Sequence, residues 1–119
     1  MGRISQAGAL AALQDQDWLK SVQERTIAAR IRLSAIARAN GLRPLPSATN
    51  FVTIDCGRDG GYAKTVLAEL GKLGVFIRMP GVAPLDRCIR ISAAPDARGG
   101  KHLCRDLTSN FVGRFRPRH

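Results

Sequence analysis

The stretch GVFIRMPGVAPLDRCIRISAAP, residues 74–95, is the most informative part of this chain about its fold. It holds two runs rich in β-branched residues, 75–78 and 88–92, joined by a loop with proline and glycine. Such runs predict two strands, and each carries one arginine, Arg78 and Arg90. Because side chains alternate along a strand, Arg90 lies on the face opposite to its isoleucine neighbours. An arginine among apolar neighbours needs an anion, since burying an unpaired charge is costly.

Length and composition predict one globular domain. The chain has 119 residues, of which 45% are hydrophobic, and no apolar run reaches the roughly 18–20 residues that cross a bilayer. We read no signal peptide at the N-terminus and therefore expect a cytoplasmic protein with no membrane partner. Cys56, Cys88 and Cys104 are odd in number and far apart, and there are only two histidines. We expect neither a disulfide framework nor a metal site.

The net charge of +10 raises the alternative of a basic nucleic-acid-binding module. Residues 98–119 hold six Lys/Arg and one Asp, and residues 1–97 hold thirteen Lys/Arg and eight acids. Each part therefore has a net charge of +5, so the short tail carries half of the excess. Aromatic residues make up only 5% of the chain, too few for a sheet on which bases stack. We do not expect nucleic acid as a partner.

The order of the predicted elements indicates an α+β fold. Residues 4–40 show a helical pattern in two pieces, with Asp15 or Asp17 as the cap of the second. A turn-rich link, residues 42–49, precedes a strand over residues 50–56 and a helix over residues 62–73 capped by Asp59. With the two strands described above, this is a long N-terminal helix followed by a small β-α-β-β sheet covered by helices.

These runs resemble a known family in their order and spacing. They are LPSATNF at residues 45–51, GVFIR at 74–78 and CIRIS at 88–92, and the helical lead-in ISQAGALAAL precedes them at 4–13. The chain resembles the C-terminal small domain of pyridoxal-phosphate-dependent aminotransferases (class I/II, aspartate-aminotransferase fold), and is most similar to the histidinol-phosphate aminotransferase-like branch. We expect residues 1–97 to be the small domain and residues 98–119 an unassigned basic tail.

The resemblance supplies an anion for the two arginines. It implies that Arg90 grips the α-carboxylate of the substrate, and that Arg78 meets a distal phosphate or carboxylate near the substrate side-chain pocket. The alternative for Arg78 is a rim salt bridge, for example to Asp86. Asn50, which precedes Phe51, matches an asparagine that we interpret as structural, bonding local backbone. The implied substrate is an amino acid or a phosphorylated amino alcohol, and the implied role is amino-acid biosynthesis.

The cofactor-binding parts of this family lie in its large domain, and the chain shows no match to them. None of its four lysines has the Ser-x-x-Lys setting of the lysine that binds pyridoxal phosphate, and no Gly-rich phosphate loop opens a helix. We therefore assign no catalytic or cofactor-binding residue, and expect no covalent cofactor and no transamination by this chain alone. The lysines are Lys20, Lys64, Lys72 and Lys101.

Two features depart from the family pattern. Ala94 stands where the family commonly has glycine, and the sequence from Gly99 onward is basic and unfamiliar, although Leu103, Leu107 and Phe111 offer a surrogate helical stripe. Two hypotheses address the origin of the chain. It is either a truncated or frameshifted gene product, or a deliberately excised domain. A further alternative is a self-associating interaction fragment, because a small domain without its large domain exposes apolar helix surface. We expect a homo-oligomer, most simply a dimer.

Overall fold

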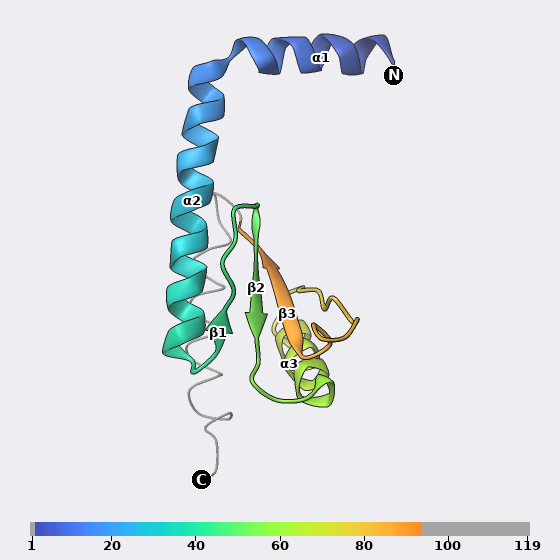
Figure 1. The fold of residues 1–119 in the computed structure, drawn as a ribbon. Helices are drawn as coiled ribbons and strands as arrows, with labels where there is room; N and C mark the ends of the chain where they lie inside the picture. Colours follow the sequence, from blue (N-terminus) through green and yellow to red (C-terminus); the bar gives the residue numbers. More distant parts are fainter. Residues whose placement is uncertain (1, 94–119) are drawn as a thin grey trace.

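The computed structural model describes residues 2–93, and their elements form an α+β fold, the class that the sequence predicts, with two differences in the strands (Figure 1). The three strands form one antiparallel sheet in the order β1-β2-β3. The predicted tail 98–119, its stripe of apolar residues and Ala94 lie outside the described residues. The elements are α1 (Arg3–Gln14), α2 (Gln16–Ala39), β1 (Arg43–Pro44), β2 (Phe51–Asp55), α3 (Gly60–Lys72) and β3 (Cys88–Ser92).

Aspartate caps begin two of the helices, as the sequence predicts. The Asp15 carboxylate accepts a hydrogen bond from the Trp18 N–H at 3.0 Å, and the chain turns there from α1 into α2. Of the two candidates for this cap, Asp15 is therefore the one used. The Asp59 carboxylate accepts from the Tyr62 N–H at 2.8 Å and begins α3. These bonds satisfy N–H groups that have no partner within the helix.

The core lies between one face of the sheet and the helices α2 and α3. Along β2 and β3 the side chains alternate, so the valine and the isoleucines of these strands face the helices. From α2 only the C-terminal half reaches this core. The central residues of the cluster are Ala29, Leu33 and Ala37 of α2, Val52 and Ile54 of β2, Val66 and Leu70 of α3, and Ile89 and Ile91 of β3.

The prediction of a full strand over residues 75–78 is wrong. This segment is extended, but its ladder with β3 is reduced to one bridge, Arg78 opposite Arg90. The segment begins at the turn that closes α3, where the Val75 N–H donates to the Leu70 carbonyl at 2.9 Å. Pro80 has no N–H to offer after the bridge, which prevents the ladder from continuing.

The sequence interpretation missed strand β1 in the region expected to be a turn-rich link. Arg43 pairs with Asp55 and Pro44 with Ile54, and the Leu45 N–H donates to the Thr53 carbonyl at 2.8 Å. Proline is tolerated because β1 is the edge strand of the sheet, where one side of the strand makes no ladder. The sequence pattern indicated a link without a strand, because proline is uncommon in strands and this short segment contains two prolines.

Helix α1 turns away from the rest of the fold and projects beyond the sheet (Figure 1). None of its residues is buried, and Leu10 and Leu13 are 58% and 67% exposed. Trp18, at the start of α2, is also exposed. Within the described residues, α1 and α2 together present an apolar surface that the sheet does not cover. No described helix has the length and apolar character of a membrane span.

Candidate anion-binding site

Arg78 and Arg90 lie directly opposite each other at the edge of the sheet. The Arg78 N–H donates to the Arg90 carbonyl at 3.1 Å, and the Arg90 N–H donates to the Arg78 carbonyl at 2.7 Å. Residues that exchange both bonds in an antiparallel pair carry their side chains on the same face. The bridge therefore brings together the two arginines that the sequence singles out, on the sheet face opposite to the core.

The Arg90 guanidinium stacks on an aromatic ring. Its Cζ lies 4.8 Å from the ring centroid of Phe51, within the range of a cation–π contact. The β2–β3 register pairs Thr53 with Arg90 and Phe51 with Ser92, so Phe51 is the diagonal neighbour of Arg90 on that face. Arg90 and Phe51 are half-buried, whereas Arg78 is exposed. The Arg90 side chain is therefore held against Phe51 and remains partly exposed.

No ion pair to a carboxylate is found for Arg78 or Arg90 among residues 2–93. In particular, the salt bridge between Arg78 and Asp86 that the sequence offers as an alternative is not formed. Two like charges placed opposite each other in a sheet repel. An anion between them would relieve this repulsion, and a guanidinium offers a planar pair of N–H donors that matches a carboxylate or phosphate. Each guanidinium is therefore suited to bind a carboxylate or a phosphate.

A neighbouring carboxylate occupies two other arginines. Asp55, at the end of β2, is 4% exposed and accepts from Arg43 Nη2 at 2.8 Å and from Arg87 Nη2 at 2.9 Å. The Gly57 N–H also donates to it at 2.8 Å. Burial acts to raise the pKa of Asp55, but the Gly57 N–H and the two guanidiniums outweigh burial and hold this pKa below its usual value of 3.8. Asp55 is thus a charged anchor for β1 and for the loop that leads into β3.

Sequence reasoning missed this anchor, although one signal was present. Asp55 ends an otherwise apolar strand and shares a face with Thr53, where a buried carboxylate needs cationic partners. Its partners come from 12 residues before and 32 residues after it in the chain, so only the fold identifies them. Because Asp55 engages Arg43 and Arg87, these two guanidiniums do not compete with Arg78 and Arg90 for an anion.

Asn50 and Phe51 lie where β2 begins. The Asn50 carbonyl accepts a hydrogen bond from the Ala93 N–H at 2.7 Å, which continues the β2–β3 pairing by one step. The Asn50 side chain is exposed, and its predicted structural role stays a prediction. The nearby Ser47 and Thr49 hydroxyls are 3.0 Å apart, and the Thr49 hydroxyl donates to the Phe51 carbonyl at 3.2 Å. These contacts order the turn that leads into the strand carrying Phe51.

The cysteines of the described region are buried free thiols. Burial, with Cys88 and Asp55 nearby, raises the pKa of Cys56 to about 11. Burial followed by the charge of Asp55 also raises the pKa of Cys88. A raised pKa keeps a thiol protonated and poorly nucleophilic. Residues 2–93 contain no cluster of His, Cys, Asp and Glu that would hold a metal ion, and Cys104 lies outside them.

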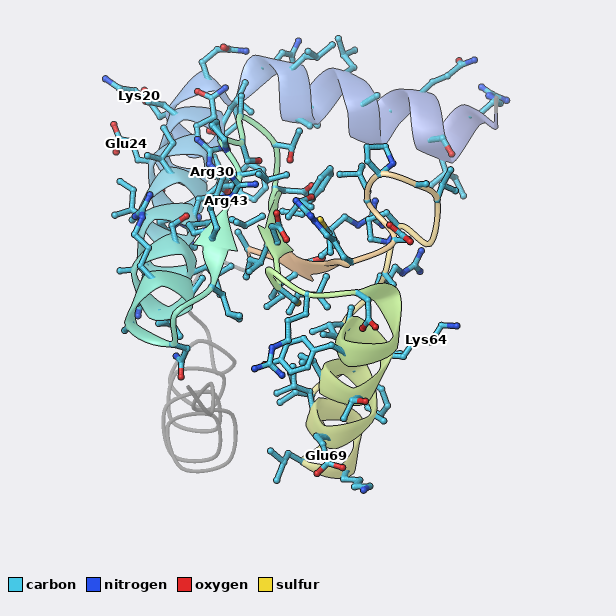
Figure 2. All side chains as sticks on the ribbon, turned by 60° about the horizontal axis from the view of Figure 1, so that its bottom comes forward. Lys20, Glu24, Arg30, Arg43, Lys64 and Glu69 are labelled. Atoms are coloured by element: carbon cyan, nitrogen blue, oxygen red, sulfur yellow. The ribbon has the colours of Figure 1, made fainter. Side chains whose placement is uncertain are left out.

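Other arginines line a groove between α2 and the link after β1. The groove has a volume of about 350 Å³, and Arg30 and Arg38 are among its lining residues. Arg30 points from α2 toward the link (Figure 2), where its Nη1 donates to the Thr49 carbonyl at 2.7 Å. This arginine therefore joins α2 to the segment before β2 instead of extending freely from a basic surface.

The described lysines do not form a site that fits pyridoxal phosphate. Lys20 and Lys64 are exposed and point away from the fold (Figure 2). Lys72 is exposed as well, and its Nζ lies 2.6 Å from the Glu69 carboxylate. A lysine that binds this cofactor must reach a pocket where its amine loses its proton. Lys101 lies outside the described residues.

The chain is similar in sequence to curated histidinol-phosphate aminotransferases. It is 33% identical over 102 residues to histidinol-phosphate aminotransferase 2 of Rhizobium meliloti, covering 85% of this chain and 28% of the relative. It is 37% identical over 90 residues to the Bacillus pumilus enzyme, covering 76% of this chain and 24% of the relative. The chain thus spans about a quarter of the length of these relatives. No family model matches the chain.

Solved structures agree with this sequence similarity. The structure of histidinol-phosphate aminotransferase from Sinorhizobium meliloti, in complex with pyridoxal-5′-phosphate, superposes with a TM-score of 0.81 and 51% identity. The match covers 93% of this chain and 29% of that one. The predicted fold class and the predicted resemblance are confirmed. The sequence and the fold of the described residues match those of part of a pyridoxal-phosphate-dependent aminotransferase.

Proposed function

We propose that this chain, which is similar to part of a histidinol-phosphate aminotransferase, supplies the substrate-binding small domain of such an enzyme. In this proposal Arg90 binds the α-carboxylate of an amino-acid substrate. Arg78 binds the distal carboxylate, or the phosphate of a phosphorylated amino alcohol. The observation that carries the proposal is the Arg78–Arg90 bridge, which places two arginines without a described carboxylate partner side by side on one face.

The proposal assigns recognition, and not the transfer of the amino group, to this chain. When bound to an aminotransferase, pyridoxal phosphate supplies the electron sink for the chemistry. The described lysines do not fit as its attachment site, and the Arg78–Arg90 pair offers hydrogen-bond donors that suit the binding of an anion. We therefore propose that the chain does not transaminate alone. We also propose that it acts in the cytoplasm and that residues 1–97 are its functional unit.

Binding of L-glutamate and L-glutamine to the chain tests the recognition step. The two amino acids share an α-carboxylate, and only glutamate has a second negative charge. We expect glutamate to bind with a dissociation constant on the order of millimolar, and more tightly than glutamine. The shifts should appear at the Nε–H resonances of Arg78 and Arg90 in a nuclear magnetic resonance titration.

Matched variants locate the binding. Arg90→Lys keeps the charge and removes the planar fork, so it should weaken binding of both amino acids about five-fold, the upper limit of roughly 1 kcal/mol for an exposed pair. Arg78→Lys should weaken only glutamate. Arg58→Lys is the control, because Arg58 also lies 4.8 Å from an aromatic ring, that of Tyr62, outside the site. Glutamate affinity that is equal in all three variants would refute the proposal.

Self-association is a second proposal, and the exposed apolar surface of α1 favours it. Leu10 and Leu13 are one turn apart on α1 and are largely exposed, and Trp18 is 56% exposed. Apolar surface of this kind usually marks an interaction site. We propose that two copies of the chain associate through α1 and the start of α2. The net charge of +10 favours neither this pairing nor a specific nucleic-acid partner.

A further inference from the structure

The ring of Phe51 faces away from the core of the domain. Val52 and Ile54 of the same strand are almost fully buried against the helices, and Phe51 points to the other face and stays half-buried. It is not among the residues of the core cluster or those packed against it. Contacts with the core therefore do not explain the position of this large aromatic side chain. On its own face, the ring contacts the Arg90 guanidinium.

The geometry of the contact leaves the donors of Arg90 available. A guanidinium over an aromatic ring is attracted by the electrons of the ring face, and its N–H groups lie around the edge of the guanidinium plane. The contact with Phe51, at 4.8 Å from Cζ to the ring centroid, therefore restrains the guanidinium, and no hydrogen bond within residues 2–93 engages its side-chain donors. An arginine restrained before binding loses less conformational freedom when an anion arrives.

Arg78 provides the contrast within the same site. It lies opposite Arg90 across the bridge, but it is exposed, and no aromatic ring is found against its guanidinium among residues 2–93. Its neighbour Phe76 is 91% exposed. The site thus combines one restrained arginine and one free arginine. A restrained arginine suits a group whose position is the same in every ligand, and a free one suits a group whose distance varies.

We propose that Phe51 is a positioning residue, whose ring orients the Arg90 guanidinium for a planar anion. This inference rests on the proposed function, because it assigns to Arg90 the binding of a carboxylate. It adds a residue with no charge of its own to the recognition site. It also divides the roles of the arginines, with Arg90 setting the geometry and Arg78 adapting to the length of the ligand.

Replacing the ring tests this role on the full chain. Phe51→Leu and Phe51→Met remove the ring and keep an apolar side chain, and Phe51→Trp keeps a ring with a stronger attraction for cations. We expect the first two variants to weaken L-glutamate binding about two- to five-fold, the fold-change that corresponds to an exposed cation–π contact. Phe51→Trp should bind as tightly as the wild type or more tightly. Tyr62→Leu, which removes the ring under Arg58, is the matched control and should leave binding unchanged.

A spectroscopic signature separates positioning from a structural role. In the free protein, the ring current of Phe51 should displace the Arg90 Nε–H resonance, and the loss of the ring should move it toward the random-coil position and increase its mobility. The Arg78 resonance should not move. In an Arg90→Gln background, Phe51→Leu should no longer change glutamate affinity, because no cation is left for the ring to orient.

The outcomes distinguish this inference from the proposed function. If the wild type does not bind glutamate, the proposed function fails, and the Arg90 resonance of the free protein still tests the contact with Phe51. If Phe51→Leu and Phe51→Met both leave the Arg90 resonance unchanged, the inference is overturned whatever binds. Should one of the two variants not fold by circular dichroism, the other decides. Weaker binding in Phe51→Trp than in the ring-free variants would also overturn the inference.

Discussion

Replacing Asp55 with asparagine tests how the anion-binding site is held in place. The Asp55 carboxylate is 4% exposed and accepts three hydrogen bonds, from the Gly57 N–H, Arg43 and Arg87. Asparagine keeps the size of the side chain and one acceptor oxygen for Gly57. It removes the charge and turns an NH₂ group toward two guanidiniums, which have only donors to offer. The loop before β3 should therefore lose its side-chain attachment to β2.

The exposure of Arg43 and Arg87 limits how much stability the Asp55→Asn substitution removes. Removing one partner of a fully buried ion pair costs about 3–5 kcal/mol, because the other charge remains buried and unpaired. Here the side chains of Arg43 and Arg87 are 72% and 47% exposed, so water solvates them once Asp55 is gone. Two pairs of this kind, together with a mismatched amide, should cost about 1–3 kcal/mol in total. The corresponding fall in melting temperature is about 4–12 °C.

Urea unfolding followed by far-ultraviolet circular dichroism measures this change. Asp86→Asn is the matched control, because Asp86 is an exposed aspartate beside Arg87 in the same loop. It should change the free energy of unfolding by no more than about 0.5 kcal/mol. If Asp55→Asn is as stable as Asp86→Asn, the reasoning that makes Asp55 an anchor is refuted.

The pH dependence gives an independent test of the same anchor. The pKa of Asp55 is lower in the folded state than its usual value of 3.8. As the pH falls below 3.8, the unfolded chain takes up the proton first, so the stability contributed by the carboxylate is complete well above 3.8 and is lost as the pH falls through the folded-state pKa. The difference in stability between wild type and Asp55→Asn should therefore shrink below pH 3.8. A difference that stays constant there would contradict the assignment.

Two further pairs of variants test the helix ends and the exposed helix. Gly71, inside α3, has open space where a Cβ atom would lie, so Gly71→Ala should stabilise the fold by about 0.5–1 kcal/mol. Gly74 has a φ of 78°, so Gly74→Ala should destabilise it by about 1–2 kcal/mol in the same urea assay, and equal effects would contradict this account. Leu13→Glu should reduce self-association measured by light scattering, whereas Gln14→Glu, which adds the same charge, should not.

Local sequence signals predicted much of the fold correctly. Asp15 and Asp59 mark the helix starts because a carboxylate that follows a turn accepts hydrogen bonds from the first N–H groups of its own helix. The alternation of Ile89 and Ile91 with Arg90 places that arginine on the face away from the core. These inferences need only residues within a few positions of each other, so they do not depend on how distant segments pack.

Long-range pairing was beyond the sequence patterns. The strand β1, the shortened ladder at Arg78 and the Asp55 anchor all depend on partners far away along the chain, and no local pattern reports which segments meet. The same holds for Phe51, which the sequence offered only as a residue of a motif. Its stacking on Arg90 follows from the register of β2 and β3, in which Thr53 lies opposite Arg90.

Local patterns were enough to predict most of the element types and the aspartate caps, because these follow from backbone preferences and side-chain periodicity. Which arginines keep their charge available depends instead on the packing of distant segments. Asp55 engages Arg43 and Arg87, while Arg78 and Arg90 face each other without a described carboxylate. The physical reason is that an arginine can bind a ligand anion only where no carboxylate of the protein lies within a few ångströms of its guanidinium. Which carboxylates come that close depends on how distant segments of the chain fold together.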